Sequence, residues 1–299
     1  MKCGRHRIQF VVLSLVWIIL GCGNSNNPGA VELPESVVAS DDSGATSRAM
    51  SDIVRGKVAM ANGSPISIPE AQVSLILIGV PDQPGDNVQL SPTVKADGTY
   101  EQQLRPGQYH FADAMIELPY MGENYRLDLD PVGNMHAPRP SAAGISQDFV
   151  WRISGQRPGT KGDLEQPMHW YGGHLSIQYA IYREDVKRAI GLPETGTKFK
   201  FELTPQGPLI DGTVGKTLVF DREWTADMSV TSSLAIPDVP IGAYTLTGEI
   251  MKPDGTKKQA VFDVSFAKFS TEVEIRFPPR RLTNSVETRL LSVGEVLDE

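Results

Sequence analysis

Short stretches in which apolar and polar residues alternate, separated by glycine- and proline-containing turns, place the strongest constraint on how this chain can fold. Residues 198–203 (KFKFEL) put phenylalanine and leucine on one face and lysine and glutamate on the other. This period of two is typical of a half-buried β-strand, because successive side chains of a strand point to opposite faces of its sheet. Asn62-Gly63 and Asp97-Gly98 are strong turn signals between such stretches. The pattern therefore predicts an all-β protein.

The first folded unit is predicted over residues 53–114, where short strands and turns follow one another closely. Five motifs occur there in order: GKV at 56–58, NGSPI at 62–66, AQVSL at 71–75, DGTY at 97–100 and LRPGQYHF at 104–111. Together they resemble the carboxypeptidase regulatory-like domain, a transthyretin-like (prealbumin-like) β-sandwich. The resemblance implies a module found beside metallocarboxypeptidases that carries no peptidase chemistry of its own.

A second antiparallel β-sandwich is predicted over residues 173–278. Its stretch 235–247, in which a Pro/Gly turn leads into a tyrosine-bearing strand, repeats the theme of residues 104–112. In both turns the glycine, Gly107 or Gly242, is expected to adopt a positive φ, which glycine reaches without steric cost.

Other stretches of the chain after residue 114 show a weaker alternation of apolar and polar residues. Residues 115–172 are expected to form an irregular connecting segment with one strand near 148–153, and residues 183–190 a brief helix. Residues 279–299 are expected to form a polar tail with at most a short helix.

The N-terminus has the pattern of an export signal. Basic residues at positions 2, 5 and 7 precede an apolar run over residues 8–20, which is too short to span a bilayer. The run ends in Ile19-Leu20-Gly21-Cys22, which resembles the lipobox of bacterial lipoproteins. The resemblance implies removal of residues 1–21 and a thioether-linked diacylglycerol on Cys22. The alternatives are an ordinary signal peptide with an incidental cysteine, or a signal anchor that is retained.

Residues 22–52 are predicted to form a flexible linker, since the sequence after the cysteine is rich in Gly, Asn, Ser and Asp and holds few core-forming side chains. We therefore expect a protein of the cell envelope, anchored to a membrane through lipid and facing the periplasm or the cell surface. Its partners would be the membrane and an envelope glycan or protein.

Charge and cysteine content exclude several classes of function. With 28 Lys+Arg against 36 Asp+Glu, the net charge of −8 argues against nucleic acid as a partner, because phosphate binding requires a basic face. Cys3 and Cys22 are the two cysteines of the chain, so thiol catalysis and cysteine-based metal sites in the body are excluded.

No catalytic motif is present in the sequence. It contains no His-Glu-x-x-His or His-x-x-Glu spacing, no Gly-x-Ser-x-Gly elbow and no P-loop. We expect a non-catalytic protein without a cofactor; an enzyme whose catalytic groups are dispersed along the chain stays the alternative. His169 and His174 are weak candidates for a metal site because no third ligand accompanies them.

Two clusters are candidate binding sites. Trp151, Trp170 and Tyr171 lie near the connecting segment and could stack on a sugar ring, which makes carbohydrate recognition the alternative function. A run of acidic residues could hold calcium at a loop, although a solvated surface is the simpler interpretation. Its members are Glu117, Glu123, Asp128 and Asp130.

Overall fold

The computed structural model describes residues 52–81, 83–179, 181–183, 188–190, 192–229, 231–264, 269–280 and 285–295. The predicted signal peptide, Cys22 and the linker as far as residue 51 lie outside these residues. Strands dominate the described part, where the helical elements are two single 3-10 turns, η1 (Ser141–Ala143) and η2 (Pro167–His169). Within it, no helix is long and apolar enough to cross a membrane. The all-β prediction is confirmed.

The strands fall into two groups, which we call the first β module (residues 53–151) and the second β module (residues 173–294). The strands of the first are β1 (Ile53–Met60), β2 (Gln72–Gly79), β3 (Val88–Leu90), β4 (Thr99–Gln103), β5 (Gln108–Tyr120), β6 (Glu123–Pro131), β7 (Arg139–Pro140), β8 (Ile145–Ser146) and β9 (Phe149–Trp151). Those of the second are β10 (Gly173–Tyr179), β11 (Ile181–Arg183), β12 (Arg188–Ile190), β13 (Lys198–Pro205), β14 (Leu218–Glu223), β15 (Leu234–Val239), β16 (Ala243–Met251), β17 (Lys257–Gln259), β18 (Val261–Asp263), β19 (Val273–Arg276) and β20 (Thr288–Gly294).

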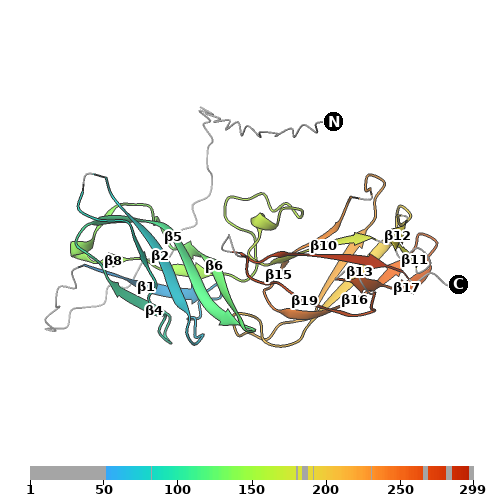
Figure 1. Ribbon diagram of the computed structural model, residues 1–299, viewed down its shortest axis with the longest axis horizontal. Coiled ribbons are helices and arrows are strands. Elements are labelled where there is room, and N and C mark those ends of the chain that lie inside the picture. Colours follow the sequence, from blue (N-terminus) through green and yellow to red (C-terminus); the bar gives the residue numbers. More distant parts are fainter. Residues whose placement is uncertain are drawn as a thin grey trace, which may run out of the picture. The chain divides into compact units, whose positions relative to one another are not determined.

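The first β module is built on strand pairing in the order β3-β2-β5-β6-β9-β1-β4, with β7 on β5 and β8 on β1 (Figure 1). Most ladders are antiparallel, as expected, but β1 runs parallel to β8 and β9. Aromatic side chains fill the core: Tyr100, Tyr109, Phe111, Phe149 and Trp151 are each about 1% exposed.

The second β module contains two larger sheets and a hairpin. One sheet has the order β15-β10-β20-β18, the other β14-β13-β16-β17 with β19 on β16, and β11 pairs with β12. Ring contacts join the two larger sheets: Tyr179 of β10 packs against Phe199 of β13 at 5.8 Å, and Phe201 of β13 against Phe262 of β18 at 6.1 Å between centroids. Two layers that bury aromatic rings between them form the predicted sandwich.

Residues 115–151 are not irregular, which corrects the expectation for this part of the connecting segment. Strand β5 continues to Tyr120, and β6, β7, β8 and β9 follow it. A β-bulge explains why the sequence hid the continuation. Ile76 pairs with Asp113 but Leu77 pairs with Phe111, so that Ala112 is an extra residue in β5. One extra residue shifts the alternation of buried and exposed side chains, and the period of two is lost from the sequence.

The predicted polar tail is wrong for residues 288–294. Strand β20 lies between β10 and β18 and is parallel to β10, with Leu291 and Val293 buried. The predicted helix at 183–190 is also wrong, because Arg183 ends strand β11 and residues 188–190 form β12. Strands β11 and β12 have three residues each, too few to show a period of two. In β20 the last four residues are all buried, so buried and exposed positions do not alternate there.

Gly107 and Gly242 do not adopt a positive φ, so the expected reason for these glycines is wrong. Each precedes by two residues a tyrosine whose hydroxyl donates to a backbone carbonyl four residues earlier: Tyr109 to Arg105 at 3.2 Å and Tyr244 to Pro240 at 2.7 Å. A Cβ on the glycine would lie 3.0 Å or 3.2 Å from the tyrosine Cε2. Closer still are the Pro84 carbonyl oxygen, 2.6 Å from a Cβ on Gly107, and Leu209 Cδ2, 2.7 Å from a Cβ on Gly242. Glycine is needed at both positions because neighbouring atoms, the tyrosine ring among them, leave no space for a Cβ.

Candidate functional site

The segment between the two modules, residues 152–172, forms a compact loop with its own hydrogen bonds. The N–H of Arg157 donates to the His169 carbonyl at 2.8 Å, and the N–H of Tyr171 donates to the Gly155 carbonyl at 3.0 Å, which closes the two ends of the loop on each other. Thr160 Oγ1 donates to the Arg157 carbonyl at 2.8 Å. A loop whose ends are close and whose interior is hydrogen-bonded is an ordered structural element of the surface.

Arg157 is the central side chain of this loop. Its Nη1 is ion-paired with Asp128 of β6, and its Nε donates to the Trp170 carbonyl at 2.9 Å. Its guanidinium also lies over the Tyr171 ring, 4.7 Å from the centroid. Because only 17% of the Arg157 side chain is exposed, these charge-assisted and cation–π contacts are partly shielded from water and are stronger than surface pairs.

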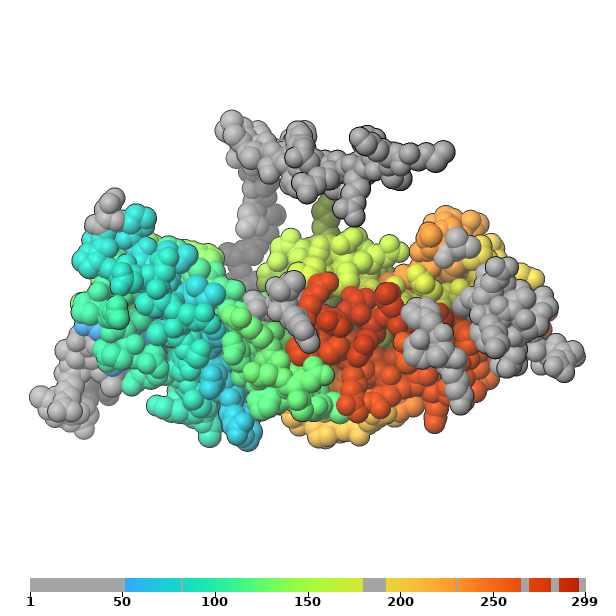
Figure 2. Space-filling model, viewed as in Figure 1, coloured from blue at the N-terminus to red at the C-terminus, as the bar shows by residue number. Residues whose placement is uncertain are grey.

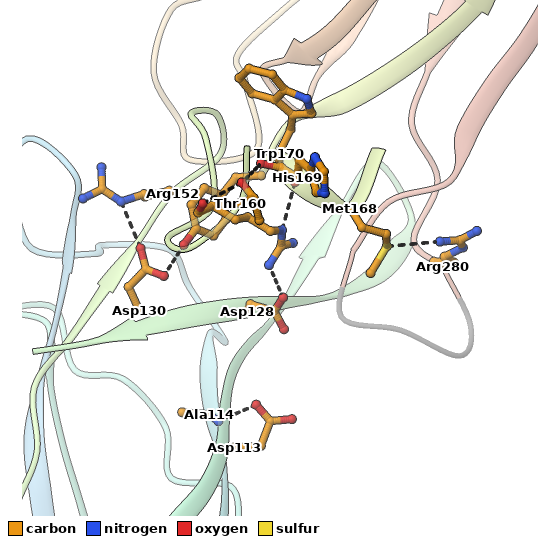
Figure 3. A network of polar contacts seen from close by, with 12 residues as sticks. Asp113, Ala114, Asp128, Asp130, Arg152, Thr160, Met168, His169, Trp170 and Arg280 are labelled. Carbon is orange, nitrogen blue, oxygen red and sulfur yellow. Dashed lines mark hydrogen bonds and ion pairs between the residues drawn. The ribbon is translucent and has the colours of Figure 1, made fainter. Parts of the chain in front are cut away.

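Asp130 lies two residues after Asp128 and takes part in the same contacts. Residues i and i+2 of a strand share a face, and Figure 3 shows both carboxylates directed toward the residues of the loop. Asp130 accepts a hydrogen bond from the Tyr171 hydroxyl and pairs with Arg152 Nε at 3.0 Å. Burial, together with the Asp130 carboxylate, raises the pKa of Tyr171 well above its usual range.

Asp238 holds the loop from the side of the second module. Both of its carboxylate oxygens accept from the Gly155 N–H, at 2.7 and 2.8 Å, and Oδ1 also accepts from the Gly172 N–H at 3.2 Å. The backbone of Asp238 has φ 61°, a conformation that is uncommon outside glycine. Burial raises the pKa of Asp238, while the two N–H donors act against that rise.

We call this set of contacts the clasp. Its side chains are Asp128, Asp130, Arg152, Arg157, Tyr171 and Asp238. Two tyrosine hydroxyls add direct bonds between the modules: Tyr125 donates to the Phe277 carbonyl at 2.9 Å, and Tyr120 to the Pro208 carbonyl at 2.9 Å. Burial raises the pKa of Tyr125 to about 12. The clasp and these two bonds connect strands β5 and β6 to the second module.

The structure places the predicted aromatic residues in three different settings. Trp151 is 1% exposed and lies in the core of the first module, with no hydrogen-bond partner for its indole nitrogen within the described chain. Tyr171 is 5% exposed and belongs to the clasp. Trp170 is half-buried, and its indole nitrogen donates to the Asp163 carbonyl at 2.9 Å. The three rings therefore do not form a common stacking surface for a sugar.

The two histidines lie on separate elements, half-buried His169 at the end of η2 and His174 on β10, and within the described chain the Nδ1 atom of each is buried without a hydrogen-bond partner. His174 is 6% exposed on β10, and burial lowers its pKa. Among the described residues, no three His, Cys, Asp or Glu side chains are placed to hold a metal ion. Asp128 and Asp130 are neutralised by arginines, and Glu117 pairs with Arg126 at 3.4 Å.

A cavity with a volume of about 480 Å³ lies over the outer face of β13, β14 and β16. Charged side chains of both signs line it, among them Lys198 and Lys200, which are exposed as predicted. Glu249 and Lys257 pair there at 2.9 Å. This is a solvated sheet face, where opposite charges on neighbouring strands stabilise the sheet modestly.

Sequence reasoning missed Arg157 and Asp238, the two residues that hold the loop most extensively. Arg157 is 29 residues from Asp128, and Asp238 is 83 residues from Gly155. No periodic pattern or short motif indicates contacts over such separations, and a lone charged residue in a loop is read by default as solvated.

No protein-family model matches the sequence, and no curated protein matches it. Several solved structures show a weak likeness. The Bacillus anthracis TIE protein is 10% identical, with a TM-score of 0.34 over 83% of this chain and 34% of that one. A DUF3823 family protein from Bacteroides ovatus is 8% identical, with a TM-score of 0.20 over 76% and 98%. The C-terminal fragment of the pilus adhesin SpaC from Lactobacillus rhamnosus GG is 8% identical, with a TM-score of 0.24 over 81% and 96%. This chain spans about a third of the TIE protein, and likenesses this weak carry no argument about its function.

Proposed function

We propose that this chain is a lipid-anchored, non-catalytic protein of the cell envelope. Its two β modules would bind or position other envelope components, glycan or protein, and the clasp would hold the modules together as one unit. The lipid anchor is inferred from the lipobox-like sequence that ends at Cys22. The non-catalytic role is inferred from the carboxylates of the clasp, which hold the connecting loop in place.

The observation that carries the proposal is that Asp128, Asp130 and Asp238 serve as structural acceptors. Each accepts from, or is ion-paired with, groups of the connecting loop. A catalytic carboxyl group must lie within hydrogen-bond reach of the substrate atom that it serves. Carboxylates whose partners are arginines, a tyrosine hydroxyl and backbone N–H groups instead fix the position of a loop between two modules.

Metabolic labelling with palmitate tests the anchor. We expect label in the wild-type chain and in Cys3→Ser, and none in Cys22→Ser, because Cys22 is the residue to which the lipobox resemblance assigns the thioether. The Cys3→Ser variant is the matched control, since Cys3 would leave with the signal peptide. Label that persists in Cys22→Ser, or absence of label from the wild type, would overturn the anchor.

A further inference from the structure

The loop between the modules presents two apolar side chains to solvent. Leu164 is 51% and Met168 is 50% exposed. The backbone around them is held in place, because the Gln166 N–H donates to the Asp163 carbonyl at 3.3 Å and the His169 N–H donates to the Gln166 carbonyl at 3.0 Å. A pre-ordered loop loses little conformational entropy when a partner covers it. We call residues 161–168 the loop tip.

A groove with complementary character lies between strands β19 and β20. Its volume is about 440 Å³, and Val264 and Leu290 expose 46% and 56% of their surface along it. The groove is lined by Val264, Glu274, Ile275, Arg276, Thr288, Arg289 and Leu290. In Figure 2 the loop (yellow-green) and strand β20 (red) both reach the surface that faces the reader.

The charged side chains of the loop tip and of the β19–β20 groove are complementary. At the loop tip, Asp163 and Glu165 are exposed on either side of Leu164. In the groove, Arg276 is ion-paired with Glu274, while Arg289 donates through Nε to the Arg276 carbonyl and forms no ion pair within the described chain. With Lys161 also exposed, the loop tip carries one positive and two negative charges, a net charge of −1. The groove offers the acidic pair a cation beside apolar side chains.

We propose that the loop tip of one copy of this chain docks in the β19–β20 groove of a second copy. Leu164 and Met168 would cover Val264 and Leu290, and the Glu165 carboxylate would pair with Arg289. The two features lie close enough for a reciprocal exchange, because Arg280, four residues after β19, donates to the Met168 sulfur at 3.6 Å. Each copy can then give its loop and accept the other's, which produces a closed two-fold dimer.

Cysteine cross-linking of the full chain in a cell lysate, with an added oxidant so that the result does not depend on the compartment, tests the contact. Met168→Cys and Leu290→Cys are introduced into separately tagged copies in a Cys3→Ser, Cys22→Ser background, which leaves no other thiol. We expect the co-expressed pair to form a disulfide-linked heterodimer, since the contact brings the Cα atoms to within about 7 Å. The control pairs Met168→Cys with Val214→Cys, a position that is more exposed, at 89%. The heterodimer should exceed this control by at least about tenfold, because a thiol outside the contact meets its partner only by random collision.

Exchanging the charges of Glu165 and Arg289 tests whether these two residues pair in the contact. Glu165→Arg or Arg289→Glu alone should lower the cross-linking yield about tenfold, and the two together in each copy should restore it. Circular dichroism of each variant shows whether the β-fold is retained. Cross-linking no higher than the control, or cross-linking that Glu165→Arg leaves unchanged in a folded chain, would overturn the proposal. This test does not depend on the lipid anchor, so its failure is distinguishable from failure of the palmitate experiment.

Discussion

At the scale of single residues, Arg157 makes three different kinds of contact within the clasp. This side chain contacts a carboxylate of β6, a backbone carbonyl of its own loop and the face of Tyr171. Removing it would leave the Asp128 carboxylate, whose side chain is 32% exposed, without its counter-charge, and would leave the Trp170 carbonyl without the Nε donor.

The substitution Arg157→Met keeps the aliphatic stem and removes the guanidinium. We expect it to lower the free energy of unfolding by about 1–3 kcal/mol, measured by urea titration. Lys161→Met is the matched control in the same loop, because Lys161 is exposed, and we expect a change within about 0.5 kcal/mol. Equal effects of the two substitutions would show that the Arg157 contacts do not stabilise the fold.

His174 gives the fold a pH dependence. Burial lowers its folded-state pKa, while an unfolded chain holds histidine near a pKa of about 6.5. The unfolded state therefore binds the proton more tightly, and the stability present above about pH 6.5 is lost as the pH falls toward the folded-state pKa. We expect His174→Gln to show a smaller loss of unfolding free energy than the wild type between about pH 7.5 and 5. Equal changes of unfolding free energy with pH in the wild type and in His174→Gln would contradict this role of His174.

At the scale of elements, strands with an uninterrupted period of two could be predicted and the others could not. The faces of β13 were predicted correctly because Phe199 and Phe201 alternate with lysines. The continuation of β5 was hidden by the bulge at Ala112, and β20 by its short, mixed sequence. What these two strands lack is a local signal, since their positions depend on neighbouring strands distant in sequence.

The tyrosine-bearing turns give a prediction at the same scale. Gly242→Ala should lower the free energy of unfolding, measured by urea titration, by about 1–3 kcal/mol. A Cβ at this position would lie 2.7 Å from Leu209 Cδ2 and 3.2 Å from the Tyr244 ring. Gly207→Ala is the control, since that position has no positive φ and no atom within 4 Å of an added Cβ. We expect Gly207→Ala to be neutral or slightly stabilising. An equal loss of stability in both variants would refute the claim that the close packing of Leu209 and Tyr244 requires glycine at position 242.

At the scale of the whole molecule, the clasp makes the two modules depend on each other. Three carboxylates, two arginines and a tyrosine connect strand β6, the connecting loop and strand β15, which contains Asp238. The all-β character could be predicted from the sequence. The clasp could not. Asp128 and Asp130 were interpreted as a solvated surface and Tyr171 as part of a binding surface, and no pattern singled out Arg152, Arg157 or Asp238.

Differential scanning calorimetry of the full chain tests this coupling most directly. We expect one cooperative unfolding transition in the wild type, because breaking the clasp exposes paired charges at the same time as it separates the modules. In Arg157→Met combined with Asp238→Ala, we expect two resolved transitions, the first at a lower temperature. Two transitions in the wild type that the double substitution leaves unchanged would contradict the claim that the clasp joins the modules into one unit.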